Sequence, residues 1–217
     1  MKVALIGASG FVGQHILQEL INRKHTVTAI VRNPEKITTK DLLLTVIKAD
    51  VLQEDEVATS VKNNDAVVSA YNAGWANPNI YHEFIAGCKS IQAGVKKAGI
   101  KRLIIIGGAG SLYVAPGVQI IDTPQFPEEF KPGASAARDY LKMIQEEKDL
   151  DWTFFSPAIE MSPAHPGTRT GTYRTATDNP VFDENGRSRL SVEDVAVAIV
   201  DELENQKFSR TRFTAAY

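Results

Sequence analysis

The sequence predicts an α/β fold in which helices cover both faces of a doubly wound parallel sheet. Short apolar runs rich in β-branched residues alternate along the chain with stretches of helical periodicity. One such run, at residues 102–106, is almost continuously apolar, as is typical of parallel strands buried on both faces. A glycine-rich turn joins the first apolar run to the first helical stretch, which indicates a strand–turn–helix unit.

Length and composition set further bounds. The 217 residues are 43% hydrophobic and 23% charged, which suits a globular domain. The net charge of −2 argues against a nucleic-acid partner held by bulk charge. No apolar run approaches the ~20 residues of a membrane helix, and the N-terminus is not a secretory signal. We therefore expect no membrane partner and a cytoplasmic location.

The chain offers little for metal chemistry. Cys88 is the only cysteine, so neither an intramolecular disulfide nor a Cys-rich metal site is expected, and its thiol is expected in the core. The four histidines lack the paired spacing of a zinc site. We expect no metal.

The first motif is the glycine turn that follows the apolar residues 3–6. It reads Gly7-Ala8-Ser9-Gly10-Phe11-Val12-Gly13. Gly7 allows the tight reversal, Gly10 lets a pyrophosphate approach the backbone N–H groups, and Gly13 lets the helix lie close to the strand. The helix N-terminus adds partial positive charge toward phosphates. We predict that these seven residues bind a dinucleotide; a plain tight turn is the alternative.

The second strand, at residues 26–31, is followed by Arg32. The adenine ribose of a dinucleotide lies beyond this strand end, where an acidic residue binds the 2′-hydroxyl of NAD and an arginine suits the 2′-phosphate of NADP. Arg32, which Lys36 could assist, therefore favours NADP, and NAD is the alternative. The other interpretation of Arg32 is a surface arginine that binds no ligand.

The third strand end lies on the same predicted edge. A strand at residues 42–49 leads into Asp50 and Val51, which we assign to the cofactor site. The carboxylate of Asp50 either contacts the adenine or caps the next turn. A short helix at 54–61 and a strand at 65–70 follow.

Ala70, Tyr71 and Asn72 leave the carboxyl end of this fourth strand. Ligands of open α/β sheets bind beyond the carboxyl ends of the strands, so we predict that these residues contact the cofactor. A long helix at 79–98 then leads to the fifth strand at 102–106.

The fifth strand ends in a run of small residues, Gly107-Gly108-Ala109-Gly110-Ser111-Leu112. Gly108 and Ala109 would let a bound ring come close to the backbone, so both are assigned to the cofactor site. Ser111 is a candidate catalytic residue. Prolines punctuate residues 112–132, which we interpret as a long loop that forms a wall or lid of the pocket.

A helix at 134–148 and a strand at 151–157 follow, and Pro157 at the end of that strand is assigned to the cofactor site. From residue 158 to 185 the chain is irregular and rich in proline and glycine. We interpret residues 158–190 as a small irregular C-terminal cap.

Ser191 has the pattern of a helix N-cap with acidic residues behind it, and residues 212–215 predict a last strand. Strands that alternate with helices at this spacing imply right-handed crossovers and a Rossmann-type sheet. We interpret residues 1–217 as a single domain that includes the cap.

The motifs resemble the extended and atypical short-chain dehydrogenase/reductase superfamily. The glycine motif, Val31-Arg32 and Asp50-Val51 carry the general resemblance. A more specific set is similar to a bacterial branch provisionally named NADH-flavin reductase, itself similar to NmrA-like proteins and biliverdin reductase B. That set is Gly107-Gly108-Ala109-Gly110-Ser111-Leu112, Asp151-Trp152-Thr153, Ser156-Pro157, Gly167-Thr168-Arg169-Thr170-Gly171 and Ser191-Val192-Glu193-Asp194. The resemblance covers essentially the whole chain and implies a reductase-like protein that binds NAD(P)H.

The sequence departs from the superfamily at its acid–base pair. Standard members use a Tyr-x-x-x-Lys pair, in which the lysine lowers the pKa of the tyrosine. Tyr140 lies on the predicted helix, but Ile144 stands where the lysine would be. Lys142 is two residues on, about 200° around the helix, and faces away. Tyr140 and Ser111 remain candidate catalytic residues, Ser111 because it falls near the superfamily's serine; packing on the sheet is the alternative for Tyr140.

A dinucleotide and a pocket without that pair indicate hydride transfer. The hypothesis is transfer from NADPH to a flat conjugated acceptor, a flavin or a quinone, whose reduced ring delocalises the charge. Two alternatives stay open: a non-catalytic NADP(H) redox sensor of the NmrA-like type, and an NAD-dependent sugar epimerase or dehydratase. No oligomeric state is predicted.

Overall fold

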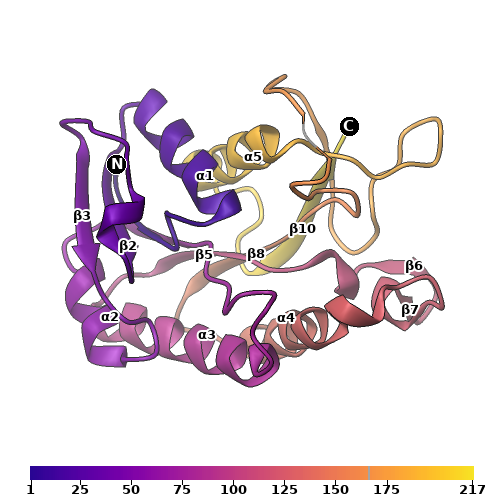
Figure 1. Cartoon of the computed structure of the whole chain (residues 1–217), viewed down its shortest axis with the longest axis horizontal. Helices are drawn as coiled ribbons and strands as arrows, with labels where there is room; N and C mark the ends of the chain where they lie inside the picture. Colours follow the sequence, from indigo (N-terminus) through magenta and orange to yellow (C-terminus); the bar gives the residue numbers. More distant parts are fainter. Residues whose placement is uncertain (166) are drawn as a thin grey trace.

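The computed structural model describes residues 1–165 and 167–217, and its centre is an eight-stranded sheet between two layers of helices (Figure 1). The strand order is β3-β2-β1-β4-β5-β8-β10-β9. Neighbouring strands pair in parallel except β10 and β9, which are antiparallel. The strands are β1 Lys2–Ile6, β2 Thr26–Val31, β3 Leu44–Lys48, β4 Ala66–Ser69, β5 Arg102–Ile106, β8 Asp151–Ser156, β9 Arg174–Ala176 and β10 Thr211–Ala216. The Rossmann-type fold expected from the sequence is confirmed.

Alternation along the strands explains the two helical layers. In β1, Val3 and Leu5 belong to one apolar core, whereas Ala4 and Ile6 belong to the other. Helices α1 (Phe11–Asn22) and α5 (Val192–Asn205) cover the first core. Helices α2 (Glu54–Val61), α3 (Ile80–Lys97) and α4 (Lys131–Ile144) cover the second core, on the opposite face (Figure 1).

The strand order reverses direction between β1 and β4. The chain after β1 moves toward β2 and β3, whereas the chain after β4 moves toward β5, so the two connections diverge at the carboxyl ends of β1 and β4. Such a switch point leaves a crevice in which open α/β sheets bind their ligands. The glycine turn lies at this point.

Two predicted boundaries are corrected. The third strand begins at Leu44 instead of residue 42, because Leu42 is fully exposed in the preceding turn. Helix α4 spans Lys131–Ile144 instead of 134–148. Pro132 lies within its first turn, where the missing N–H costs no helical hydrogen bond.

The predicted long loop at 112–132 contains short elements. Strands β6 (Tyr113–Ala115) and β7 (Val118–Gln119) form a hairpin that Figure 1 shows beside the start of α4. Its turn is Pro116-Gly117, where Gly117 has φ of 73°, a conformation that favours glycine. Two 3-10 turns follow, η3 Ile120–Asp122 and η4 Glu128–Phe130. Residues 112–132 are therefore folded into short elements and are not a long loop.

The predicted cap also returns to the main sheet. Strand β9 within it pairs with β10. Near its middle, the N–H groups of Thr170 and Gly171 donate to the carboxylate of Asp194 on α5. These contacts attach the predicted cap to the sheet and to α5; the single domain at residues 1–217 stays a prediction. Within the described residues, no helix combines the length and apolar character needed to cross a membrane.

Candidate functional site

The glycine turn after β1 has the geometry of a phosphate cradle. Gly7 has φ of 78°, and a β-carbon there would lie 2.6 Å from the carbonyl oxygen of Ala70. A β-carbon on Gly13 would lie 2.1 Å from the carbonyl oxygen of Gly7, so α1 packs directly on the turn. Gly10 is different: it is exposed, and its β-carbon would meet only the carbonyl oxygen of Gly7, at 3.3 Å. The fold requires two of these glycines, whereas the third leaves open space above the backbone.

Helix α1 begins at this open space. Gly10 is its N-cap and makes no side-chain hydrogen bond, and the first turn carries no acidic residue. The N–H groups of that turn are therefore not capped by a side chain in the described structure, and the helix dipole favours negative charge there. The cradle and the helix start together fit the pyrophosphate of a dinucleotide. Ala8, Ser9, Phe11 and Val12 lie in the same turn and helix start.

The strand ends on the β2 side lie at the same edge. Arg32 follows β2 and is exposed, as a ligand for a 2′-phosphate must be. Asp50 follows β3, and its Oδ1 accepts a hydrogen bond from the N–H of Leu52 at 3.0 Å. This contact is the turn cap that the sequence analysis kept as an alternative. Val51 beside it is buried.

The first side chains after β4 are held by contacts within the protein. The hydroxyl of Tyr71 donates to the carbonyl of Glu83 at 3.0 Å, and its ring stacks on Phe84. Burial raises the pKa of Tyr71 to about 12. Asn72 Oδ1 accepts from the N–H of Gly74 at 2.7 Å. Tyr71 and Asn72 therefore shape the loop with their side chains, which leaves their backbone, with that of Ala70, as the part that can face a cofactor.

The residues after β5 form the 3-10 turn η2 (Ala109–Ser111), which packs on the start of α4. A β-carbon on Gly108 would lie 3.5 Å from that of Ala137, and one on Gly110 would lie 3.2 Å from that of Ala134. Pro157 after β8 is buried. The face of α4 toward the strand ends therefore carries small residues.

Gly133 belongs to this small-residue face of α4. A β-carbon there would lie 2.7 Å from Cζ3 of Trp75, because the indole covers the helix backbone. Gly133 and Ala137 are four residues apart, the spacing of the superfamily's Tyr and Lys; Gly133 lies against Trp75 of the β4–α3 loop, and Ala137 lies against Gly108 after β5. No titratable side chain lies at either position.

Ser111 is buried and fixed by an arginine that the sequence analysis did not single out. Arg212 Nη1 on β10 donates to the Ser111 carbonyl at 2.8 Å and to its Oγ at 3.2 Å. Arg212 also pairs with Asp178 of the cap. An arginine inside a short strand with no other charged residue was the available signal. The catalytic role of Ser111 stays a prediction.

Tyr140 is packed in the core, and its catalytic role stays a prediction. The side chain is 1% exposed, and its hydroxyl donates to Gln92 Oε1 at 3.2 Å. Burial raises the pKa of Tyr140 well above its ordinary value. Ile144, one turn on, is fully buried. This position agrees with the packing alternative and lies nearly two turns along α4 from Gly133.

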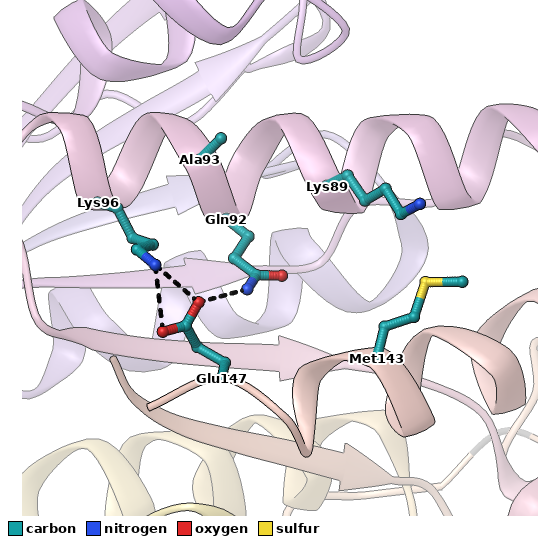
Figure 2. A pocket seen from close by; sticks show the side chains of 6 residues that line it. All are labelled: Lys89, Gln92, Ala93, Lys96, Met143 and Glu147. Carbon is teal, nitrogen blue, oxygen red and sulfur yellow. Dashed lines mark hydrogen bonds and ion pairs between the residues drawn. The ribbon is translucent and has the colours of Figure 1, made fainter. Parts of the chain in front are cut away.

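A recess of about 520 Å³ lies elsewhere, between α3 and α4 (Figure 2). It is lined by Lys89, Gln92, Ala93, Lys96, Met143 and Glu147. Glu147 accepts hydrogen bonds from Gln92 and Lys96 (Figure 2). These residues lie toward the C-terminal ends of both helices, hence at the amino edge of the sheet, so the recess is not the cofactor crevice. Within the described residues, no cluster of three or more His, Cys, Asp or Glu side chains could hold a metal ion.

Comparisons with known proteins agree with this fold. A family model described as NAD(P)H-binding matches residues 7–206. The uncharacterised protein YwnB of Bacillus subtilis is 40% identical over 216 residues, which cover 99% of this chain and 97% of YwnB. A Bacteroides thetaiotaomicron structure provisionally named an epimerase is 48% identical, with a TM-score of 0.92 and coverage of 100% of this chain and 96% of that chain. A Streptococcus pneumoniae structure provisionally named an NADH-flavin reductase is 36% identical, with a TM-score of 0.84 and coverage of 100% and 99%.

Proposed function

Because the chain belongs to the NAD(P)H-binding family, we propose that it is an NADPH-dependent reductase of a flat conjugated acceptor, either a flavin or a quinone. The fold is that of the short-chain dehydrogenase/reductase superfamily, and the family comprises oxidoreductase-like and epimerase-like proteins. The exposed Arg32 at the ribose corner supports NADPH over NADH. The proposed location is the cytoplasm.

The observation that carries this proposal is the small-residue face of α4. Gly133, Ala134 and Ala137 pack against the segments that follow β4 and β5, whereas Tyr140 is buried farther along the helix. Exchange between alcohols and ketones, like sugar epimerisation, moves a proton to or from an oxygen and so calls for a positioned acid or base. Reduction of a flavin or quinone gives an anion spread over a ring, for which such a group matters less.

The residues of the chain then act mainly by binding and orientation. NADPH, when bound, supplies a hydride, so two electrons and one proton pass together to the acceptor, and solvent water supplies the second proton that completes its reduction. The glycine turn holds the pyrophosphate, and Arg32 holds the 2′-phosphate. The half-buried Gly108 and Ala109 after β5 let a flat ring approach the backbone closely.

A redox sensor is the second candidate, because a missing acid–base pair suits a protein that only binds NADP(H). The name of the Bacteroides thetaiotaomicron relative keeps an epimerase as a third. Neither alternative requires a flat acceptor.

The test is anaerobic oxidation of NADPH, and separately NADH, with FMN, riboflavin and menadione as acceptors. We expect acceptor-dependent turnover well above the uncatalysed rate and faster with NADPH. Tight NADPH binding without turnover on any acceptor would favour the sensor. Turnover of nucleotide sugars or simple ketones, with none of flavins or quinones, would favour the third candidate.

A further inference from the structure

The loop between β4 and α3 presents an aromatic side chain at the ligand edge. Trp75 is 58% exposed, although burial of an indole is strongly favourable. It lies five residues after Ala70, whose carbonyl contacts the glycine turn. Trp75 also covers Gly133 at the start of α4. The indole therefore lies between the carboxyl end of β4 and the small-residue face of α4.

The exposed indole is held in place. One side of it packs against Gly133, which Ile80 also approaches: a β-carbon on Gly133 would lie 2.7 Å from Trp75 Cζ3 and 2.9 Å from Ile80 Cδ1. Phe130, which is 41% exposed, meets the indole edge to face, with ring centroids 5.3 Å apart and an interplanar angle of 79°. The two rings are therefore nearly perpendicular to each other, and both are partly exposed.

The polypeptide that carries Trp75 is ordered by asparagine side chains. Asn72 Oδ1 accepts from the N–H of Gly74, directly before the indole. Asn77 Nδ2, two residues after the indole, donates to Glu83 Oε2 at 2.8 Å on α3. The N–H of Asn77 also donates to the carbonyl of Gly74 at 3.0 Å. These bonds close the loop on both sides of Trp75, so little side-chain or backbone freedom is left to lose on binding.

We propose that Trp75, with Phe130 beside it, is the stacking platform for the flat acceptor. This inference rests on the proposed function and names its acceptor subsite. A conjugated ring on the indole gains offset stacking and removes the exposed apolar surface from water, and Phe130 offers its ring at right angles to the stack. The platform selects acceptors by flatness, because stacking on the two rings requires no particular substituent, and the indole N–H is the one hydrogen-bond donor that the rings carry.

Trp75 also supplies its own reporter, since the only other tryptophan is Trp152. Trp152 is buried in β8 and donates from Nε1 to the carbonyl of Glu147. In the Trp152→Phe variant, the fluorescence comes from Trp75 alone. Titration with FMN or menadione, without NADPH, should quench it saturably. The Trp75→Phe variant keeps Trp152, which should show only the weak, non-saturating quenching of a buried indole.

Binding and turnover complete the test. Trp75→Ala should raise the Kd and KM for FMN roughly tenfold and leave the Kd for NADPH unchanged, because stacking is lost and the cradle is intact. In Trp75→Phe, the Kd and KM for FMN should stay within about threefold of those of the unmodified chain, because the phenyl ring still stacks. Leu42→Ala truncates another exposed apolar side chain, in the turn before β3. It should change none of these three constants.

Two results would contradict the proposed stacking platform. They differ in whether the proposed reductase function survives. Unchanged KM for FMN in Trp75→Ala, in a protein that reduces FMN, would remove the platform and leave the reductase. Failure of the unmodified chain to bind or reduce FMN and menadione, while it binds NADPH, would remove both. Saturable quenching together with the selective rise in Kd supports the platform.

Discussion

A β-carbon on Gly13 would lie 2.1 Å from the carbonyl oxygen of Gly7, whereas one on Gly10 would meet the same oxygen at 3.3 Å. The two glycines of one motif therefore serve different purposes. Gly13 is needed for α1 to pack on the turn. A β-carbon on Gly10 would meet that one oxygen alone, and the open space on its other side is where the phosphate of the proposed cofactor would lie.

The first prediction separates folding from binding with this pair. Gly13→Ala should destabilise the fold by about 1–3 kcal/mol or more through overpacking against backbone. Gly10→Ala should change the free energy of unfolding by less than about 1 kcal/mol but raise the Kd for NADPH at least tenfold. Urea unfolding and fluorescence titration of NADPH measure the two effects. If Gly10→Ala binds NADPH normally, the motif is a tight turn and not a phosphate cradle.

The second prediction concerns the choice of cofactor. Arg32→Asp should weaken NADPH binding far more than NADH binding, because the carboxylate repels the 2′-phosphate and can bind a 2′-hydroxyl. The matched control is Lys62→Asp, the same change of charge at the end of α2 and the opposite edge of the sheet. It should alter neither Kd. Equal losses for both cofactors in Arg32→Asp would remove Arg32 from the site.

Most of the fold could be predicted because local patterns and long-range packing agree there. The start of the chain shows this best: an apolar run, three glycines and an amphipathic stretch follow one another, and all three indicate the same strand–turn–helix unit. The hairpin of residues 113–119 was missed because it is short and lies in a proline-rich segment. The Pro116-Gly117 pair was a sufficient turn signal, but two flanking strands of two or three residues carry no periodicity.

Sequence patterns could indicate only the parts of the candidate site that consist of backbone atoms. Glycines and strand ends have fixed positions once the topology is known, whereas side-chain directions depend on distant partners. Tyr71 points into α3 because Glu83 offers a carbonyl, and Ser111 is held by Arg212, 101 residues away in sequence. No periodic pattern in the sequence marks Trp75, because it lies in a loop and its indole packs on Gly133, which is distant in sequence.

The third prediction tests the packing role of Tyr140. Tyr140→Phe should cost about 1 kcal/mol of stability, because it removes a buried hydroxyl and leaves Gln92 Oε1 without that donor. Activity with FMN should stay within about twofold. Tyr81→Phe on α3 removes a hydroxyl that donates to Asp139 on α4, and it serves as the control. A loss of about 100-fold or more in kcat/KM would restore an acid–base role for Tyr140.

The fourth prediction follows from the carboxylate that fastens the cap. Asp194 is fully buried and accepts hydrogen bonds from the N–H and hydroxyl of Thr170, the N–H of Gly171 and the hydroxyl of Tyr217. Burial alone would raise the pKa of Asp194, but the bonds from Thr170, Tyr217 and Gly171 outweigh it, and the pKa lies below its ordinary value.

The sign of the pH dependence is therefore fixed. A carboxyl group whose pKa is lower in the folded chain stabilises it above the unfolded pKa of about 3.9, and this contribution is lost as the pH falls through the folded pKa. Asp194→Asn places an amide donor among donors and should cost about 2–4 kcal/mol at neutral pH. The difference from the unmodified chain should shrink below about pH 4. Urea unfolding across this range measures it, with the exposed Asp55→Asn as control. A deficit that stays constant with pH would show that the charge of Asp194 does not hold the cap.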